Sequence, residues 1–66
     1  MNKNEIIVLI NLLQETENQI PDDQWDENHW KGFKAGIIES INFLTHSSFN
    51  YNINAKDIWE NLKRRF

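Results

Sequence analysis

The sequence predicts an all-α fold, a small three-helix bundle with a long central helix that is completed by dimerisation. Apolar residues recur at spacings of three and four in three separate segments, as they do on one face of an α-helix. The only stretch with a period of two, residues 49–53, has no second strand with which to pair. A chain of 66 residues is expected to form one domain, 1–66. Because so short a chain buries only about 60% of its extended surface, sharing a core with a second copy is favourable.

The first helix is predicted to begin after Asn2. Asn2 and Glu5 have the spacing of a capping box, and Met1 and Ile6 have that of a hydrophobic staple. The apolar stripe of this helix consists of Ile6, Leu9, Ile10 and Leu13. The helix is expected to fade through the polar residues 14–19 before Pro21.

A second apolar pair lies on the flank of this stripe. Val8 and Leu12 are four residues apart and widen the apolar arc of the helix to about 200°, more than one neighbouring helix covers. We therefore expect Val8 and Leu12 to form a self-association surface. A twofold dimer is the commonest homo-oligomer, and it is the form we expect.

The central helix is predicted to run from about Asp22 to about Thr45. One face carries the apolar residues Trp30, Phe33, Ile37, Ile41 and Leu44. Beside that face, Gly32, Gly36 and Ser40 form a stripe of small residues. Each glycine inside a helix costs about 0.5–1 kcal/mol relative to alanine, so we expect an offsetting close contact, with Trp59 as the ring that approaches.

Residues 46–54 are predicted to form a loop that lays Phe49, Tyr51 and Ile53 onto the core. Asn54 then caps the last helix, with Asp57 at its third position, and Ile53 and Ile58 form a second hydrophobic staple. The apolar face of this helix is expected to consist of Ala55, Ile58, Trp59, Leu62 and Phe66.

Composition excludes several classes of function. The chain has no cysteine, which removes disulfides and thiolate zinc sites. Asp22, Asp26 and His29 lack zinc-motif spacing, and no nucleophile is paired with a base, so we expect no enzyme activity, no metal and no cofactor. The longest apolar run, residues 6–10, is far shorter than the roughly 20 residues that span a bilayer, and no leader precedes it. Ten asparagines, nine isoleucines and five lysines suggest an AT-rich genome, so we expect a cytoplasmic protein of a low-GC bacterium or its phage.

Charge is distributed unevenly along the chain. Residues 4–30 contain seven acids and no base, whereas residues 31–66 carry six bases and three acids. The densest acidic group is Asp22, Asp23, Asp26 and Glu27. Part of this clustering is favoured by the positive end of a helix dipole. We also interpret it as a patch that docks on the basic surface of another protein, with the chain acting stoichiometrically as an inhibitor or regulator encoded by a phage or mobile element.

The C-terminal segment DIWENLKRRF supports an alternative. Ile58 and Trp59, followed by Asn61 and a basic run, resemble the recognition helix of a homeodomain over ten residues. The chain departs from that family because it has no basic N-terminal arm, its central helix is too long, and Asn61 is not at the adenine-reading position. A helix-turn-helix regulator of this kind would contact nucleic acid through Lys56, Lys63, Arg64 and Arg65.

A third hypothesis is an oligomeric binder of a nucleotide or another small ligand. Trp30 offers a ring for stacking, and Lys31 and Lys34 offer charges for phosphates. Their spacing matches no phosphate-binding loop, and both lysines point away from the apolar stripe.

Overall fold

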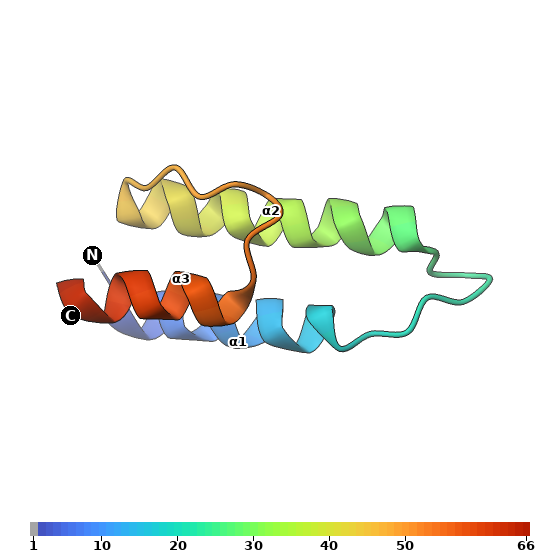
Figure 1. Ribbon diagram of the computed structural model, residues 1–66, viewed down its shortest axis with the longest axis horizontal. Coiled ribbons are helices and arrows are strands. Elements are labelled where there is room, and N and C mark those ends of the chain that lie inside the picture. The colour runs from blue at the N-terminus through green and yellow to red at the C-terminus, as the bar shows by residue number, and fades with distance from the viewer. Residues whose placement is uncertain (1) are drawn as a thin grey trace.

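The computed structural model describes residues 2–66, which fold into three α-helices without a β-strand in that range. The helices are α1 (Lys3–Glu17), α2 (Glu27–Thr45) and α3 (Ala55–Leu62), and a 3-10 turn, η1 (Lys63–Arg65), follows α3. α1 and α2 form an antiparallel hairpin, and α3 returns alongside α1 (Figure 1). The predicted all-α bundle with a long central helix is confirmed, since α2 has 19 residues. No helix between Asn2 and Phe66 has both the length and the apolar character needed to cross a bilayer.

Two of the predicted helix starts are confirmed by their caps. The side chain of Asn2 accepts hydrogen bonds from the backbone N–H groups of Asn4 (3.0 Å) and Glu5 (3.2 Å). The side chain of Asn54 accepts one from the N–H of Asp57 at 2.8 Å. These bonds satisfy donors that a helix leaves unpaired at its N-terminus. The proposed staple between Met1 and Ile6 lies partly outside the described residues.

The predicted start of α2 is wrong by five residues, because the helix begins at Glu27 and not near Asp22. The carboxylate of Asp22 instead accepts hydrogen bonds from the N–H groups of Gln24 (2.9 Å) and Trp25 (2.7 Å), which closes a turn. Asp26 is the residue that caps α2, since its side chain accepts from the N–H of His29 at 2.8 Å. Two aspartates four residues apart could each start a helix, and the one that follows the turn does so.

The hydrophobic core lies where α1 contacts both other helices. Its buried apolar members are Ile6, Ile10, Leu13, Ile37, Ile38, Ile41, Ala55, Ile58 and Leu62. On α2 the buried face is rotated from the predicted one. Ile38, which the predicted stripe omitted, is fully buried, whereas Phe33, which it included, is exposed. The third helix follows the prediction at Ala55, Ile58 and Leu62, but Trp59 and Phe66 are exposed.

The loop between α2 and α3 is held by one asparagine. The side chain of Asn42 donates to the carbonyl of Phe49 (3.0 Å) and accepts from its N–H (2.8 Å). Phe49 and Ile53 pack against the core as predicted. The same expectation for Tyr51 is wrong, because its side chain is exposed. Tyr51 lies in a turn closed by the hydrogen bond from the Ile53 N–H to the Asn50 carbonyl at 3.0 Å, so the alternation of a regular extended strand does not hold there.

The expected contact between the glycine stripe and Trp59 is also wrong. A Cβ atom added at Gly32 or at Gly36 would meet nothing within 4 Å, so both glycines face open space. Trp59 is on α3, which packs beside α1, and its ring lies 6.0 Å from that of Phe66. The two glycines therefore have no packing partner within the described chain.

Candidate partner-binding surfaces

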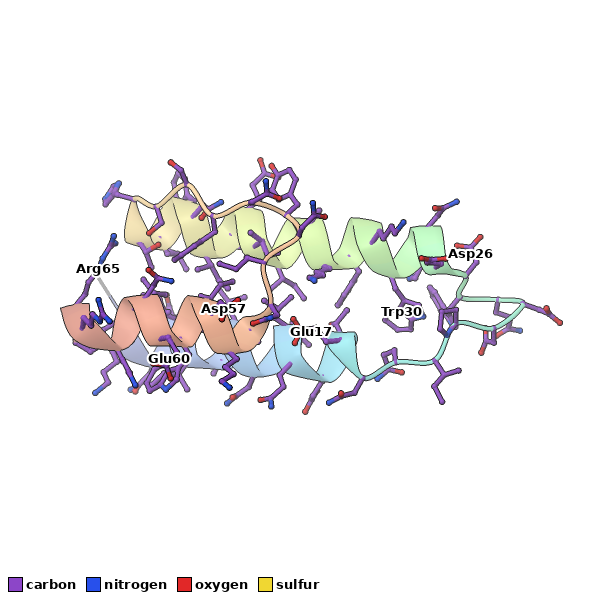
Figure 2. All side chains as sticks on the ribbon, viewed as in Figure 1. Glu17, Asp26, Trp30, Asp57, Glu60 and Arg65 are labelled. Atoms are coloured by element: carbon purple, nitrogen blue, oxygen red, sulfur yellow. The ribbon has the colours of Figure 1, made fainter. Side chains whose placement is uncertain are left out.

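The acidic residues singled out in the sequence gather at one end of the molecule. Asp22, Asp23, Asp26 and Glu27 all belong to the connection between α1 and α2 or to the first residue of α2, and all are exposed. We call these four residues the acidic tip. Figure 2 shows Asp26 at the start of α2, beside the connection that extends beyond the ends of both helices.

Three of the four acids also have local roles. Asp22 closes the turn and Asp26 caps α2, as described above, while Glu27 pairs with Lys31 one helical turn later at 3.6 Å. Each aspartate uses one carboxylate oxygen in these bonds, which leaves the other free for solvent or for a partner. Asp23 forms no side-chain hydrogen bond with the described residues. The charges of the three aspartates are therefore exposed to the outside, while the charge of Glu27 is partly offset by Lys31.

An aromatic cluster lies directly beside the acidic tip. The rings of Trp25 and His29 are 4.1 Å apart, and Trp30 lies 6.2 Å from Trp25 and 6.0 Å from Phe33. Trp25 is 47% exposed, so its ring is half in solvent, and its backbone N–H donates to the carboxylate of Asp22. The indole Nε1–H of Trp30 is buried and has no acceptor among residues 2–66. Sequence reasoning placed Trp30 on the helix but gave no role to Trp25.

The residues of the small-ligand hypothesis do not form a common pocket. Trp30 belongs to the aromatic cluster, whereas Lys31 pairs with Glu27 on the exposed side of α2. The Nζ atom of Lys34 lies 3.9 Å from a carboxylate oxygen of Glu17, at the end of α1. Both lysines thus face carboxylates, which reduces their capacity to bind phosphate.

Of the basic residues of the nucleic-acid hypothesis, two form contacts within the molecule and two are exposed without such contacts. Nη1 of Arg65 donates to the carbonyl of Thr45 (3.0 Å) and to the hydroxyl of Ser47 (3.1 Å), so this guanidinium closes the C-terminal end of α2. Figure 2 shows Arg65 at that end of the bundle. Nζ of Lys63 lies 2.8 Å from the carboxylate of Glu60. Lys56 and Arg64 remain exposed on the surface of α3 and η1.

The basic segment lowers the pKa of the Glu60 carboxyl. The hydrogen bond from Lys63 and the positive charge of the same side chain hold the pKa of Glu60 below its ordinary value, with smaller contributions from Lys56 and Arg64. The acid therefore stays ionised and offsets part of the positive charge of the C-terminal segment. A phosphate backbone approaching this segment would meet a carboxylate among the cations.

A groove that sequence reasoning did not predict runs between α1 and α3. It has a volume of about 400 Å³ and is lined by Ile7, Ile10, Asn11, Gln14, Glu17, Asn54, Ala55, Lys56 and Trp59. Its floor is apolar and its rim carries amide and charged groups. The carboxylate of Glu17 accepts a hydrogen bond from the N–H of Ala55 at 2.8 Å, so it has a structural role in the fold.

Apolar side chains of α1 and α2, some exposed and some half-buried, line two neighbouring depressions on the hairpin. We call the following residues the apolar face: Val8, Leu9, Leu12, Phe43 and Leu44, of which Leu9 and Leu44 are half-buried. Val8 and Leu9 line a depression together with Leu44 of α2, which shows that the two helices share this face. Phe43 is 81% exposed and Val8 is 64% exposed. The sequence predicted an unpartnered flank on α1 at Val8 and Leu12, but it gave no sign that Phe43 extends that flank on α2.

No family model matches the chain, and comparison with curated proteins and with solved structures finds no match either. Within residues 2–66, His, Asp and Glu side chains form no group of three or more that could hold a metal ion. The Asp22, Asp26 and His29 set is used in turn and helix capping. The arrangement of surfaces is therefore the basis for a functional hypothesis.

Proposed function

We propose that the protein is a non-enzymatic protein-binding module, which acts stoichiometrically as an inhibitor or regulator of a macromolecular partner. One observation carries the proposal: the half-exposed ring of Trp25, which lies 4.1 Å from the ring of His29, belongs to the same short segment as the four exposed acids of the acidic tip. Tryptophan is the residue most enriched in the energetic centres of protein interfaces, and surrounding charges steer a partner of opposite sign. The acidic tip therefore fits the basic surface of another protein.

The composition extends this proposal to the source. An asparagine-, isoleucine- and lysine-rich chain suits a phage or mobile element of a low-GC bacterium, acting in the host cytoplasm. A nucleic-acid-binding groove is one basic surface that such an acidic protein would occupy, because the acidic tip would replace phosphates there.

The helix-turn-helix alternative has weaker geometric support. It requires Lys56, Lys63, Arg64 and Arg65 as contacts, yet Arg65 is bound to the end of α2 and Lys63 to Glu60. Of these four residues, only Lys56 and Arg64 have neither an ion pair nor a side-chain hydrogen bond within the described chain. The alternative therefore ranks second.

The test compares two charge variants as baits for proteins from cells of the encoding organism. The acid variant carries Asp23→Asn, Asp26→Asn and Glu27→Gln, so that residue 26 retains an acceptor for the N-cap. The basic variant carries Lys56→Gln, Lys63→Gln and Arg64→Gln and leaves Arg65 in position. We expect the wild type and the basic variant to retain the same partner and the acid variant to lose it. The association rate should also fall with added salt, because exposed charges are screened over about 8 Å at physiological ionic strength.

The opposite pattern would overturn the proposal. If the basic variant loses the captured species and the acid variant keeps it, the helix-turn-helix alternative replaces the protein-binding module. A captured species with excess absorbance near 260 nm that survives in both variants would instead support the nucleotide hypothesis at Trp30, Lys31 and Lys34. Circular dichroism of both variants serves as the control for folding, since the lost helix-dipole interactions cost only about 0.3–1 kcal/mol each.

A further inference from the structure

The groove between α1 and α3 is bounded at both ends by contacts between these two parts of the chain. The two helices run antiparallel (Figure 1). At one end the carboxylate of Glu17 accepts a hydrogen bond from the N–H of Ala55. Beyond the other end, Nζ of Lys3 lies 5.6 Å from the ring centroid of Phe66, which follows η1. The volume of about 400 Å³ falls within the roughly 300–1,000 Å³ of small-molecule sites, so the groove suits a compact ligand better than an extended segment of a partner.

The apolar part of the groove combines aliphatic side chains with one aromatic ring. Ile10 and Ala55 are buried in the floor, and Ile7 beside them is half-buried. The side chain of Trp59 is 37% exposed, and its ring centroid lies 6.0 Å from that of Phe66. Because the Phe66 ring covers only part of the indole, Trp59 also offers planar apolar surface to the groove. Aromatic groups pack on such a surface in offset-stacked or edge-to-face arrangements.

Two side-chain amides on the α1 side of the groove have no partner within the described chain. Asn11 and Gln14 both line the groove, and neither side chain forms a hydrogen bond with residues 2–66. The third amide of the lining, that of Asn54, already accepts from the N–H of Asp57 as the cap of α3. Each of the two remaining amides carries N–H donors. A ligand with an acceptor oxygen would therefore find donors on α1.

The charges around the groove leave one cation without a counterion. Glu17 is the acid of the lining, and Nζ of Lys34 lies 3.9 Å from its carboxylate. Lys56, on the α3 side, forms no ion pair within the described chain. The acid one helical turn after it, Glu60, is paired with Lys63 at 2.8 Å. The lining therefore favours a ligand with one negative charge, because a charge-assisted hydrogen bond is stronger than a neutral one.

We propose that this groove binds a small aromatic carboxylate. The aromatic group lies on Trp59 and the aliphatic floor. The carboxylate accepts hydrogen bonds from the ammonium of Lys56 and from the amide of Asn11 or Gln14, which are all donors, as an acceptor-only group requires. None of the lining residues belongs to the acidic tip, so the inference is independent of the proposed function.

An NMR titration of the isotope-labelled full chain with 2-naphthoate tests the proposal. We expect saturable shifts of the indole N–H of Trp59 and of the backbone amides of Asn11, Gln14 and Lys56. The dissociation constant should be about 1 mM or lower, as is usual for a ligand of this size. The neutral 2-naphthamide should bind about threefold more weakly, because it lacks the charge that Lys56 attracts. Acetate, which lacks the ring, should give no saturable shift at these residues.

Two variants with matched controls separate the charge from the ring. Lys56→Gln should remove the advantage of the carboxylate over the amide, whereas Lys31→Gln, an equal change on the exposed side of α2, should retain it. Trp59→Leu should weaken the binding of both probes about fivefold, because the stacking surface is lost. Trp25→Leu, at the other end of the molecule, should leave both affinities unchanged. Circular dichroism verifies that each variant folds.

Three results would overturn the proposal. One is the absence of a saturable shift at Trp59 up to about 5 mM 2-naphthoate. Another is a set of shifts confined to the apolar face or to the acidic tip, which would place the ligand outside the groove. The third is an equal affinity of the wild type for the carboxylate and the amide, or an advantage of the carboxylate that survives Lys56→Gln. If Trp59→Leu fails to fold, the shifts of the wild type and the Lys56→Gln comparison still decide between these outcomes.

Discussion

The carboxylate of Glu17, at the last residue of α1, accepts a hydrogen bond of 2.8 Å from the backbone N–H of Ala55, the first residue of α3. The end of one helix thereby satisfies a donor at the start of another, 38 residues later. The same carboxylate oxygen lies 3.9 Å from Nζ of Lys34 on α2. One side chain therefore joins all three helices, and Figure 2 shows Glu17 where they meet.

The first prediction concerns this junction. Glu17→Ala should lower the free energy of unfolding by about 1.5–3 kcal/mol, because it leaves the Ala55 N–H without a charged acceptor in a half-buried position. Glu17→Gln should cost less, since the amide oxygen still accepts a hydrogen bond. Urea unfolding of both variants gives the values. Glu15→Ala, an exposed change on the same helix, is the control, and equal losses for Glu15→Ala and Glu17→Ala would contradict the assigned role.

Local sequence patterns predicted the fold because its decisive signals are local. Asn2 and Asn54 each precede the first turn of a helix, whose backbone N–H groups lack acceptors within the helix. The side chain of each asparagine accepts a hydrogen bond from the N–H three residues later. The contact between Glu17 and Ala55 has no such signal, since no pattern in the chain relates positions 38 residues apart. The misplaced start of α2 has a different cause. Asp22 and Asp26 are both suitable N-caps, and only the turn formed around Asp22 decides between them.

Arg65 carries the second prediction. Arg65→Ala should destabilise the fold by about 1 kcal/mol, because the guanidinium bonds the exposed end of α2 at the Thr45 carbonyl and the Ser47 hydroxyl. Arg64→Ala, its exposed neighbour, should have almost no effect on stability. Thermal unfolding followed by circular dichroism compares the two. If Arg64→Ala proves the more damaging change, the basic segment is arranged differently from the structure.

The third prediction reverses the expectation drawn from the glycine pattern. Gly32→Ala should raise the free energy of unfolding by about 0.5–1 kcal/mol, because alanine restricts the unfolded chain and a Cβ at this position meets nothing within 4 Å. The measurement is chemical unfolding at low micromolar concentration, where self-association contributes least. A loss of stability would show that a neighbour does approach the stripe.

The error over the glycines follows from which helices touch. The sequence shows that Gly32, Gly36 and Ser40 share a stripe, and it shows that Trp59 lies on the next helix, but it does not show which helix that ring covers. α3 packs beside α1, so Trp59 lines the groove between those two helices.

The candidate surfaces were predictable from the sequence only where their residues are adjacent in the chain. The acids at 22–27 are adjacent in sequence and gather at one tip, whereas Phe43 joins Val8 and Leu12 on one face only after the hairpin has formed.

The fourth prediction is a pH effect at Glu60. The hydrogen bond and charge of Lys63 depress the pKa of this carboxyl below its ordinary value of 4.5 in the folded state. A depressed folded pKa means that the interaction stabilises the fold above the ordinary pKa, and that this contribution is lost as the pH falls through the folded pKa. Lys63→Met should raise the pKa of Glu60 toward 4.5, and Lys31→Met should not. Carboxyl-carbon NMR shifts give both values, and a Glu60 titration unaffected by Lys63→Met would refute the pairing.

The fifth prediction separates the two roles of the acidic tip. Asp26→Ala should lower the free energy of unfolding by about 1 kcal/mol, because the N-cap bond to the His29 N–H at 2.8 Å is lost. Asp23→Ala should leave stability within about 0.5 kcal/mol of the wild type, since its carboxylate is exposed and bonds no described residue. Each change removes one negative charge, so urea unfolding distinguishes capping from charge alone. Equal losses for the two variants would mean that repulsion or helix-dipole effects, and not the cap, govern the start of α2.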